Sequence, residues 1–468
     1  MSTVSHIPPP PFHKEPLVFE ADMEKAHEAF ERLADRYGGK FYVRIGREPV
    51  LVLANAEDIY FVLKKRPELF APWSKYISIL TAAGIDGLEA SDGMAWKVQR
   101  EILGSVLDSK CLQRYSVRVS RAAGNLVAEL VSTAAGTSTK DLEKTIYLFT
   151  CSVYMDILLG DLVEEYRYGW ERYEEMAYGL MPLLKQRIDP IMQELHHDDF
   201  SVDADFEDRM ARLVGFVERL IQERQDSGGC QEKPPENSGM LSALLDTVAA
   251  RGLKIDDVNL LKNIFGVISA AVPTTTQTLL NVMAALADNR KLQEELQHEL
   301  DSCGAIEKAL RDPEDLKELK CLERIIQETM RMASVSRLVL VQARKDTVLD
   351  GINIPKGTPL ALLIAYCGTR GEHFTNSGRF DPRRWQPEYR PDYEPHNIKA
   401  FLPFGAGPRA CPGRGLAMIV MKTALAAIFG SFTVDYEKPS CGSRDNGEYD
   451  PAHGAFRLEP RHPKASFE

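Results

Sequence analysis

The chain has 468 residues, of which 44% are hydrophobic and 27% are charged. This balance is typical of a globular protein with a large core, and it excludes a disordered, collagen-like or disulfide-stapled chain. The formal net charge of −11 argues against nucleic acid as the main partner, because nucleic-acid-binding surfaces are basic.

The N-terminal part of the chain combines one helix with one hairpin. Residues 1–20 are interpreted as a proline-rich leader, and residues 21–468 are expected to form a single large domain. Helical spacing of apolar residues predicts a helix over residues 21–37. Alternating, β-branched sequence on both sides of Gly46 predicts a two-stranded hairpin over residues 41–53.

Helical patterns dominate the long middle of the chain, from residue 94 to about residue 330. Residues 66–92, which precede it, are expected to be irregular. Two polar segments interrupt the helical patterns, an acidic loop at 196–205 and a surface linker at 226–239.

The C-terminal third of the chain has a different pattern. Short strand-like runs occur at 338–343, 347–354 and 359–364, and they are followed by an irregular segment, 371–411, and one apolar helix, 412–430. The predicted fold is therefore mainly α with a small β portion. Irregular segments as long as this one are uncommon in compact domains and tend to be functional.

Cysteine usage and hydropathy indicate the compartment. The eight cysteines contain no C-x-x-C pair and no zinc-type spacing with the ten histidines, which indicates a reducing environment. There is no signal-peptide pattern at the N-terminus and no run of about 20 apolar residues. We expect a soluble, cytoplasmic protein, and association with a membrane through an anchor missing from this chain stays open.

One cysteine lies in a motif with a specific chemical meaning. Residues 401–418 read FLPFGAGPRACPGRGLAM and contain the pattern F-x-x-G-x-R-x-C-x-G, formed by Phe404, Gly407, Arg409, Cys411 and Gly413. The glycines predict a tight loop just before a helix, so that Cys411 lies at the positive helix end, where the thiolate is favoured over the thiol. A thiolate held in a fixed loop suits the axial position of a haem iron, where it favours O–O cleavage.

The cysteine loop, 404–413, resembles that of the cytochrome P450 family, the haem-thiolate monooxygenases. The resemblance extends over essentially the whole chain. Glu328-x-x-Arg331 is similar to the family's buried pair on one helix face, and the stretch FDPRRW at 380–385 is similar to the element that adds Arg384. The resemblance implies a P450-like fold, a network of these three side chains behind the loop, and haem b with Cys411 as its iron ligand.

The same resemblance implies which residues contact the haem. Trp96-x-x-x-Arg100 is similar to the family's propionate-binding helix, and Arg409 is carried over as another propionate partner, with Arg337 or Arg344 as a further candidate. The complete implied set is Trp96, Arg100, Ala270, Thr274, Pro403, Phe404, Gly405, Arg409, Cys411, Gly413 and Ala417.

The segment that resembles the oxygen-side helix departs from the family pattern. Residues 270–275 read AAVPTT, and Pro273 stands where the family usually has an acid before Thr274. Proline lacks an N–H, so the carbonyl of Ser269 loses its helical partner and a kink is expected. The Thr274 hydroxyl is expected to bond back to the carbonyl of Ala270.

Two hypotheses follow from Pro273. In the first, Thr274 together with Ser269 or Thr275 and ordered water delivers protons, and the enzyme inserts one oxygen atom from O2. In the second, no proton relay is needed, and the enzyme uses peroxide or rearranges an oxygenated substrate as an isomerase.

Substrate and partners follow from the resemblance in outline. Candidate pocket residues are Tyr76, Ile77, Leu80, Phe265, Val335 and Val339, with Ile79 and Ile85 near them. All but Tyr76 are apolar, which favours a hydrophobic small molecule of steroid, terpenoid or polyketide type and a role in secondary metabolism.

No flavin or iron–sulfur portion is recognised in the chain, so a separate ferredoxin or flavoprotein reductase is expected to supply electrons. Lys97, Arg100, Arg414 and Lys422 are expected to form a local basic face near the cysteine, which would steer an acidic donor. We expect a monomer.

Overall fold

The computed structural model describes residues 10–16, 23–45, 48–82, 87–133, 139–160, 239–254, 260–303, 314–437 and 455–461, with a few isolated positions between 211 and 222. The predicted acidic loop at 196–205 lies outside the described residues, as does the predicted linker at 226–239 except for Gly239.

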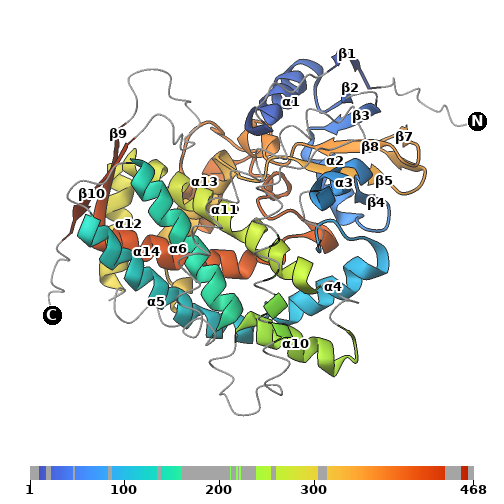
Figure 1. The fold of residues 1–468 in the computed structure, drawn as a ribbon. Coiled ribbons are helices and arrows are strands. Elements are labelled where there is room, and N and C mark those ends of the chain that lie inside the picture. The colour runs from blue at the N-terminus through green and yellow to red at the C-terminus, as the bar shows by residue number, and fades with distance from the viewer. Residues whose placement is uncertain are drawn as a thin grey trace, which may run out of the picture.

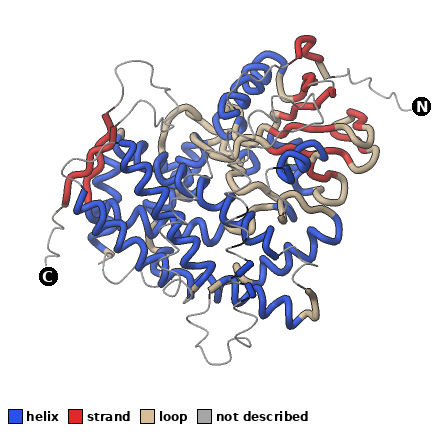
Figure 2. The backbone as a smooth tube through the Cα atoms, in the orientation of Figure 1, coloured by secondary structure: helices blue, strands red, loops and turns tan. Residues whose placement is uncertain are grey.

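Helices make up most of the described chain (Figures 1 and 2). They are α1 (Met23–Tyr37), α2 (Ala56–Lys64), α3 (Ser74–Ala82), α4 (Gly93–Ser105), α5 (Ser109–Thr133), α6 (Thr139–Leu159), α10 (Met240–Ala250), α11 (Leu260–Ala287), α12 (Arg290–Ser302), α13 (Lys320–Met332) and α14 (Arg414–Ser431). The strands are β1 (Phe12–Pro16), β2 (Lys40–Ile45), β3 (Glu48–Leu53), β4 (Phe70–Pro72), β5 (Val339–Ala343), β6 (Thr347–Leu349), β7 (Ile352–Ile354), β8 (Pro359–Leu362), β9 (Phe432–Glu437) and β10 (Ala455–Pro460). The prediction of a mainly α fold with a small β portion is confirmed.

One mixed sheet joins strands from the first 72 residues to strands between residues 339 and 362. Its strand order is β1-β2-β3-β8-β5-β4, and β3 pairs in parallel with β8 from Leu51–Leu360 to Leu53–Leu362. Successive side chains of a strand point to opposite faces, and here both faces are covered. Leu51 and Leu53 pack against α2, whereas Val50 and Val52 pack in the cluster that contains Phe30 of α1.

The helical part surrounds α11 and α14, which lie in the middle of the molecule (Figure 1). The apolar residues of α14 are buried over most of its length, and α14 packs against α5, α11 and α12. Among the described helices, α14 alone is apolar and long enough to cross a membrane by length and composition, and 72% of that window is buried inside the protein.

Several local predictions differ from the structure. Residues 12–16, placed in the leader, pair in parallel with β2 as strand β1. The segment 66–92 was expected to be irregular, but it contains β4 and α3. Both elements are short, and β4 is a strand because it pairs with β5, a partner about 270 residues away in the chain that periodicity alone cannot reveal.

The strand-like run 347–354 is a hairpin rather than one strand. β6 and β7 pair antiparallel, and Asp350 and Gly351 form its turn with positive φ angles of 47° and 77°. An Asp-Gly pair is a favoured choice for such a turn, because both central residues need φ above zero.

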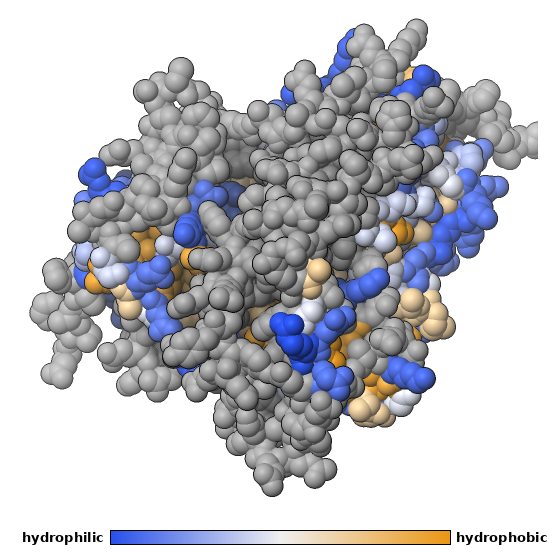
Figure 3. Space-filling model, in the orientation of Figure 1, coloured by the Kyte–Doolittle hydropathy of each residue, from blue (hydrophilic) through white to orange (hydrophobic). Residues whose placement is uncertain are grey.

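Figure 3 shows one face of the molecule coloured by hydropathy. Hydrophilic side chains predominate among the described residues near the sheet, and hydrophobic side chains show as smaller patches over the helical part.

Candidate functional site

The cysteine loop is a tight turn with a backbone geometry that needs glycine. The amide of Cys411 donates to the carbonyl of Phe404 at 2.9 Å, which closes the loop. Gly405 and Gly407 have φ angles of 67° and 72°. A Cβ on Gly407 would lie 2.3 Å from the carbonyl oxygen of Leu63, so the loop contacts the end of α2 too closely for any side chain.

Cys411 lies just before α14, whose N-cap is Gly413. Its side chain is accessible to solvent. Burial by surrounding atoms raises the pKa of the Cys411 thiol, and the amides of Gly413 and Arg414 and the charge of Arg100 lower it. The amides therefore act in the predicted sense, and burial has the larger and opposite effect on the pKa. A bound metal ion deprotonates a coordinating thiol outright.

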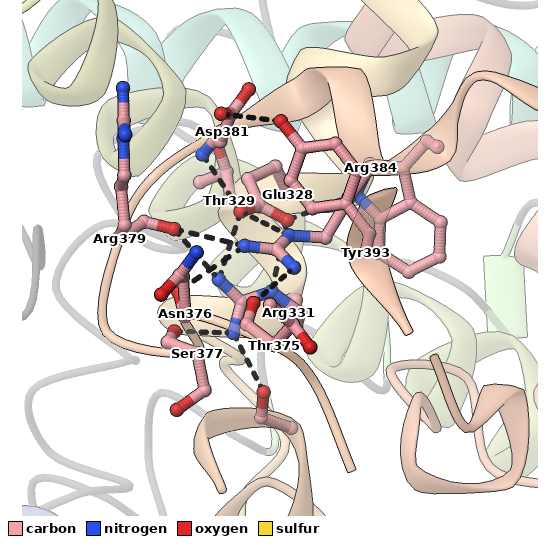
Figure 4. Close-up of polar contacts among 12 residues, drawn as sticks. Glu328, Thr329, Arg331, Thr375, Asn376, Ser377, Arg379, Asp381, Arg384 and Tyr393 are labelled. Carbon is pink, nitrogen blue, oxygen red and sulfur yellow. Dashed lines mark hydrogen bonds and ion pairs between the residues drawn. The ribbon is translucent and has the colours of Figure 1, made fainter. Parts of the chain in front are cut away.

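A closed cluster of charged side chains is formed by residues of α13 and of the segment that precedes the loop in the chain (Figure 4). The Glu328 carboxylate accepts from Arg331 at 2.8 and 2.9 Å and from Arg384 at 2.9 Å, and all three side chains are fully buried. It also accepts from the indole of Trp385 at 3.0 Å and from the amide of Asp381 at 2.9 Å. This carboxylate thus joins α13 to the irregular segment that leads to Cys411.

The two guanidinium groups of this cluster bind backbone carbonyls with their remaining N–H groups. Arg331 donates to the carbonyls of Gly368 and Ser377 at 2.7 Å each, and Arg384 donates to the carbonyl of Thr375 at 2.9 Å. Hydrogen bonds from two buried arginines therefore fix the backbone between residues 368 and 377, in the segment before the cysteine loop. A Cβ on Gly368 would lie 2.9 Å from the carbonyl oxygen of Arg331, so the approach is close.

A second arginine cluster lies at the start of α4. Arg409 stacks over the ring of Trp96 at 4.5 Å and donates to the carbonyl of Ser91 at 2.8 Å and to Asp92 at 3.0 Å. Arg344 also donates to Asp92. Asp92 is the N-cap of α4 but makes no capping bond with its side chain, because the carboxylate is taken up by the two arginines.

Arg66 belongs to the same cluster, although no sequence motif pointed to it. Burial and the positive charge of Arg409 lower the pKa of Arg66 to about 10, and burial lowers the pKa of Arg409 to about 10. Among the described residues, the buried Nε atoms of Arg66, Arg344 and Arg409 have no hydrogen-bond partner. Of the two arginines left open by the sequence, Arg344 lies in this cluster through its bond to Asp92, whereas Arg337 lies near Glu31 of α1.

α11 remains helical through Pro273. The Thr274 hydroxyl donates to the carbonyl of Ala270 at 2.8 Å, as expected, and Ser269 donates to Gly266 at 3.2 Å. Ala270 and Thr274 are exposed although α11 lies in the middle of the molecule. These two residues are four apart and share one helix face, so this face is accessible.

The candidate haem-contacting residues lie on three elements. Trp96 and Arg100 are on α4, and Ala270 and Thr274 are on α11. The remainder belong to the loop and the first turn of α14, namely Pro403, Phe404, Gly405, Arg409, Cys411, Gly413 and Ala417.

The candidate pocket residues lie on α3 and near β5. Tyr76 and Ile77 are partly buried, and Leu80 is buried on the same helix. Val335 and Val339 are partly buried, and they lie before and at the start of β5. The side chains of Phe265 and Ile79 and the whole of Ile85 lie outside the described parts.

Tyr76, the one polar member of this set, donates its hydroxyl to Glu89 at 3.0 Å.

One member of the expected basic face is placed differently. Lys422 is buried on α14, where its ammonium donates to the carbonyl of Leu316 at 3.1 Å and to Glu323 at 2.9 Å. The prediction that Lys422 is a surface charge is wrong, because its ammonium reaches α13 across the helix packing. Lys97 and Arg414 are exposed.

Comparisons with known proteins agree with this geometry. The model of the cytochrome P450 family matches residues 8–448. The chain belongs to the cytochrome P450 family. It is 22% identical over 428 residues to cytochrome P450 71B8 of Arabidopsis thaliana, covering 88% of this chain and 83% of that protein. It is 24% identical over 416 residues to cytochrome P450 4V2 of Homo sapiens (84% and 76%), and 23% identical over 415 residues to cytochrome P450 3A6 of Oryctolagus cuniculus (85% and 79%).

Membership of this family establishes the class of chemistry. The protein is a P450 oxidoreductase of the haem-thiolate monooxygenase class, and its cofactor is haem with an axial cysteine thiolate. Members of this family generally use O2, a redox partner and a hydrophobic substrate. The predicted family, fold class, enzyme class and cofactor are confirmed.

The arginines at the start of α4 fit such a cofactor. Haem b carries two propionate carboxylates, and guanidinium groups bind carboxylates with paired N–H donors. The unpartnered Nε atoms of Arg66, Arg344 and Arg409 supply such donors, and added negative charge would offset their mutual repulsion.

Proposed function

We propose that Cys411 is the axial thiolate of the haem and that Arg66, Arg100, Arg344, Arg409 and Trp96 hold its propionates. The main support for this proposal is the loop geometry, in which an accessible thiol lies beside the amides of Gly413 and Arg414 at the start of α14. When bound, the haem activates O2 and transfers one oxygen atom to the substrate. The Gly413 and Arg414 amides stabilise negative charge on sulfur, which sets how strongly the thiolate donates.

Thr274 is proposed to hold and pass protons on the accessible face of α11. Its hydroxyl already donates to the Ala270 carbonyl, so it can accept a hydrogen bond from a water molecule while keeping its orientation. Ser269, one turn earlier, is the second hydroxyl proposed for this relay, because Thr275 is buried and its hydroxyl contacts Tyr154 at 2.8 Å instead. Pro273 provides no carboxylate, so the relay is proposed to consist of hydroxyl groups and water.

The substrate is proposed to be a hydrophobic small molecule of steroid, terpenoid or polyketide type. Apolar side chains at Ile77, Leu80, Val335 and Val339 support this choice, and so does the lack of an obvious carboxylate anchor on α3, where Lys75 pairs with Glu48 at 3.1 Å. Electrons are proposed to come from a separate ferredoxin or flavoprotein reductase, with Lys97 and Arg414 on the surface that faces it.

Pro273 also favours a second mode of turnover, in which peroxide supplies the oxygen or an oxygenated substrate is rearranged. Neither reaction needs the proton relay that an acid at position 273 would serve. Turnover with peroxide, or with no electron donor at all, that exceeds turnover with O2 and a reductase would favour this second mode.

An optical titration of the ferric protein tests the main proposal. We expect the main haem band to shift from low to high spin with steroids, terpenoids or macrolides, because an apolar ligand displaces water from the iron. Cys411→Ser is expected to abolish the thiolate spectrum, whereas Cys303→Ser, which changes an exposed cysteine, is the matched control. A thiolate spectrum in Cys411→Ser would overturn the assignment, and a shift with fatty acids alone would overturn the substrate class.

A further inference from the structure

The part of α11 that carries Thr274 lacks one backbone support. Pro273 has no N–H, so the carbonyl of Ser269 receives no helical hydrogen bond from it. A proline inside a helix loosens the connection between the turns before and after it. Something else must therefore fix the second half of α11 relative to the first.

Two pairs of buried hydroxyl groups join α11 to α6 directly after the proline. Tyr154 and Thr275 have their hydroxyl oxygens 2.8 Å apart, and those of Thr150 and Thr276 are 2.6 Å apart. Thr150 and Tyr154 are one turn apart on α6, and Thr275 and Thr276 are adjacent on α11. All four side chains are buried, and we call them the hydroxyl splint.

The splint also reaches across the proline through a backbone carbonyl. The Thr276 oxygen lies 2.8 Å from the carbonyl of Val272, and the Thr150 oxygen lies 2.8 Å from the carbonyl of Tyr147. The two hydroxyl hydrogens can serve only two of these three contacts. In the arrangement that joins the helices, Thr150 donates to Thr276, and Thr276 donates to the carbonyl of Val272. The residue before Pro273 is thus linked to the helix turn after it.

The splint lies on the side of α11 away from Thr274. Successive helical residues are rotated by about 100° around the axis, which places Thr276 nearly opposite Thr274. Thr274 is exposed, whereas Thr275 and Thr276 are buried against α6. The splint can therefore fix the Thr274 hydroxyl without occupying any of the accessible face.

We propose that Tyr154 and Thr150 are positioning residues, which hold the Thr274 hydroxyl in register across Pro273 through their bonds to Thr275 and Thr276. The proposal rests on the proposed role of Thr274 in proton delivery. α6 then holds together the turns of α11 on either side of Pro273, as the backbone hydrogen bonds do in a helix without proline. Breaking the contact between α6 and α11 misplaces the Thr274 hydroxyl and leaves Cys411 unchanged.

The first experiment compares Tyr154→Phe with Tyr115→Phe in the haem-loaded enzyme. Tyr115 is also buried, and its hydroxyl donates to the carbonyl of Val106 at 3.0 Å on another helix, so both variants lose one buried hydroxyl bond. In Tyr154→Phe we expect product per NADPH consumed to fall by about fivefold, the equivalent of one net hydrogen bond. Tyr115→Phe is expected to lose a similar amount of stability with unchanged coupling.

Hydrogen exchange supplies a readout that does not depend on turnover. The amides of residues 274–278 are expected to exchange faster in Tyr154→Phe than in Tyr115→Phe, with equal haem content in both. Equal exchange and equal coupling in the two variants would overturn the splint. Failure of the unmodified protein to show a thiolate spectrum would instead overturn the proposed function.

A second pair of variants keeps the proposal testable if Tyr154→Phe fails to fold. Thr275→Ser keeps the hydroxyl and is expected to couple normally, whereas Thr275→Val removes it and is expected to match Tyr154→Phe. The double variant Tyr154→Phe/Thr275→Val is expected to lose no more coupling than either single one, because both remove the same bond. Additive losses would show that the two residues act separately.

Discussion

The two arginine clusters differ in how completely their donors are used. Around Glu328, the guanidiniums of Arg331 and Arg384 meet a carboxylate and backbone carbonyls on all sides. At the start of α4, Asp92 accepts from two arginines, while the Nε atoms of Arg66, Arg344 and Arg409 have no partner among the described residues.

The first cluster is complete without any ligand, and the second is not. Buried polar groups are almost always hydrogen-bonded in folded proteins, so a set of unpartnered donors indicates a missing acceptor. The difference separates an arginine cluster that builds the fold from one that receives an anionic group, although the two contain the same type of side chain.

The largest effect is expected from Glu328→Gln. It leaves Arg331 and Arg384 buried without a counter-charge, which is expected to lower the free energy of unfolding by about 3–5 kcal/mol. Urea unfolding of the haem-loaded protein measures this. Glu314→Gln, which breaks the exposed pair with Lys317 at 2.6 Å, is the control and is expected to cost less than about 0.5 kcal/mol. Equal losses would show that the closed cluster is not the main support of the segment.

An intermediate effect is expected from Arg66→Leu. The direction of its change in stability distinguishes the arginine cluster at the start of α4 from the one around Glu328. Removing a guanidinium whose buried Nε has no partner among the described residues is expected to leave the stability of the haem-free protein unchanged or higher. It is also expected to speed haem loss to a scavenging globin about tenfold through a lost charge-assisted hydrogen bond. Arg384→Leu is expected to destabilise the protein with or without haem. Unchanged haem loss in Arg66→Leu would place Arg66 outside the propionate site.

The smallest effect concerns His396, which stacks at 5.1 Å on Trp385 beside the closed cluster. Burial, and then the charges of Arg390 and Arg384, lower the pKa of His396 to about 4. The unfolded chain takes up this proton first, so stability is lost as the pH falls from about 6.5 towards 4. His396→Gln is expected to flatten this part of the stability–pH curve by at most about 1 kcal/mol, because the residue is only partly buried. A stability–pH curve that His396→Gln leaves unchanged would contradict the role of His396 in this pH dependence.

Much of the fold and part of the site could be predicted from short sequence patterns. The hairpin of β2 and β3, the helix α14 and the glycine loop before Cys411 depend on residues within about 20 positions of one another. Local spacing carries this information directly, because turns and helix faces are set by near neighbours.

The remaining features depend on contacts between distant parts of the chain. Strands β1 and β4 exist through their pairing with β2 and β5, and Lys422 is buried because Glu323 and Leu316 meet it from another segment. No local pattern records such partners, which explains why the leader, the segment 66–92 and Lys422 were placed wrongly.

The sequence by itself determined the family, the haem loop and the replacement of the usual acid by Pro273, because each is recognised from residues close together in the chain. Only the tertiary structure decided that Arg66 and Arg344 join Arg409, and that Tyr154 and Thr150 face the residues after Pro273. A lone arginine or tyrosine in a sequence has no specific meaning. Its role follows from the groups that folding brings within hydrogen-bonding distance or leaves without a partner.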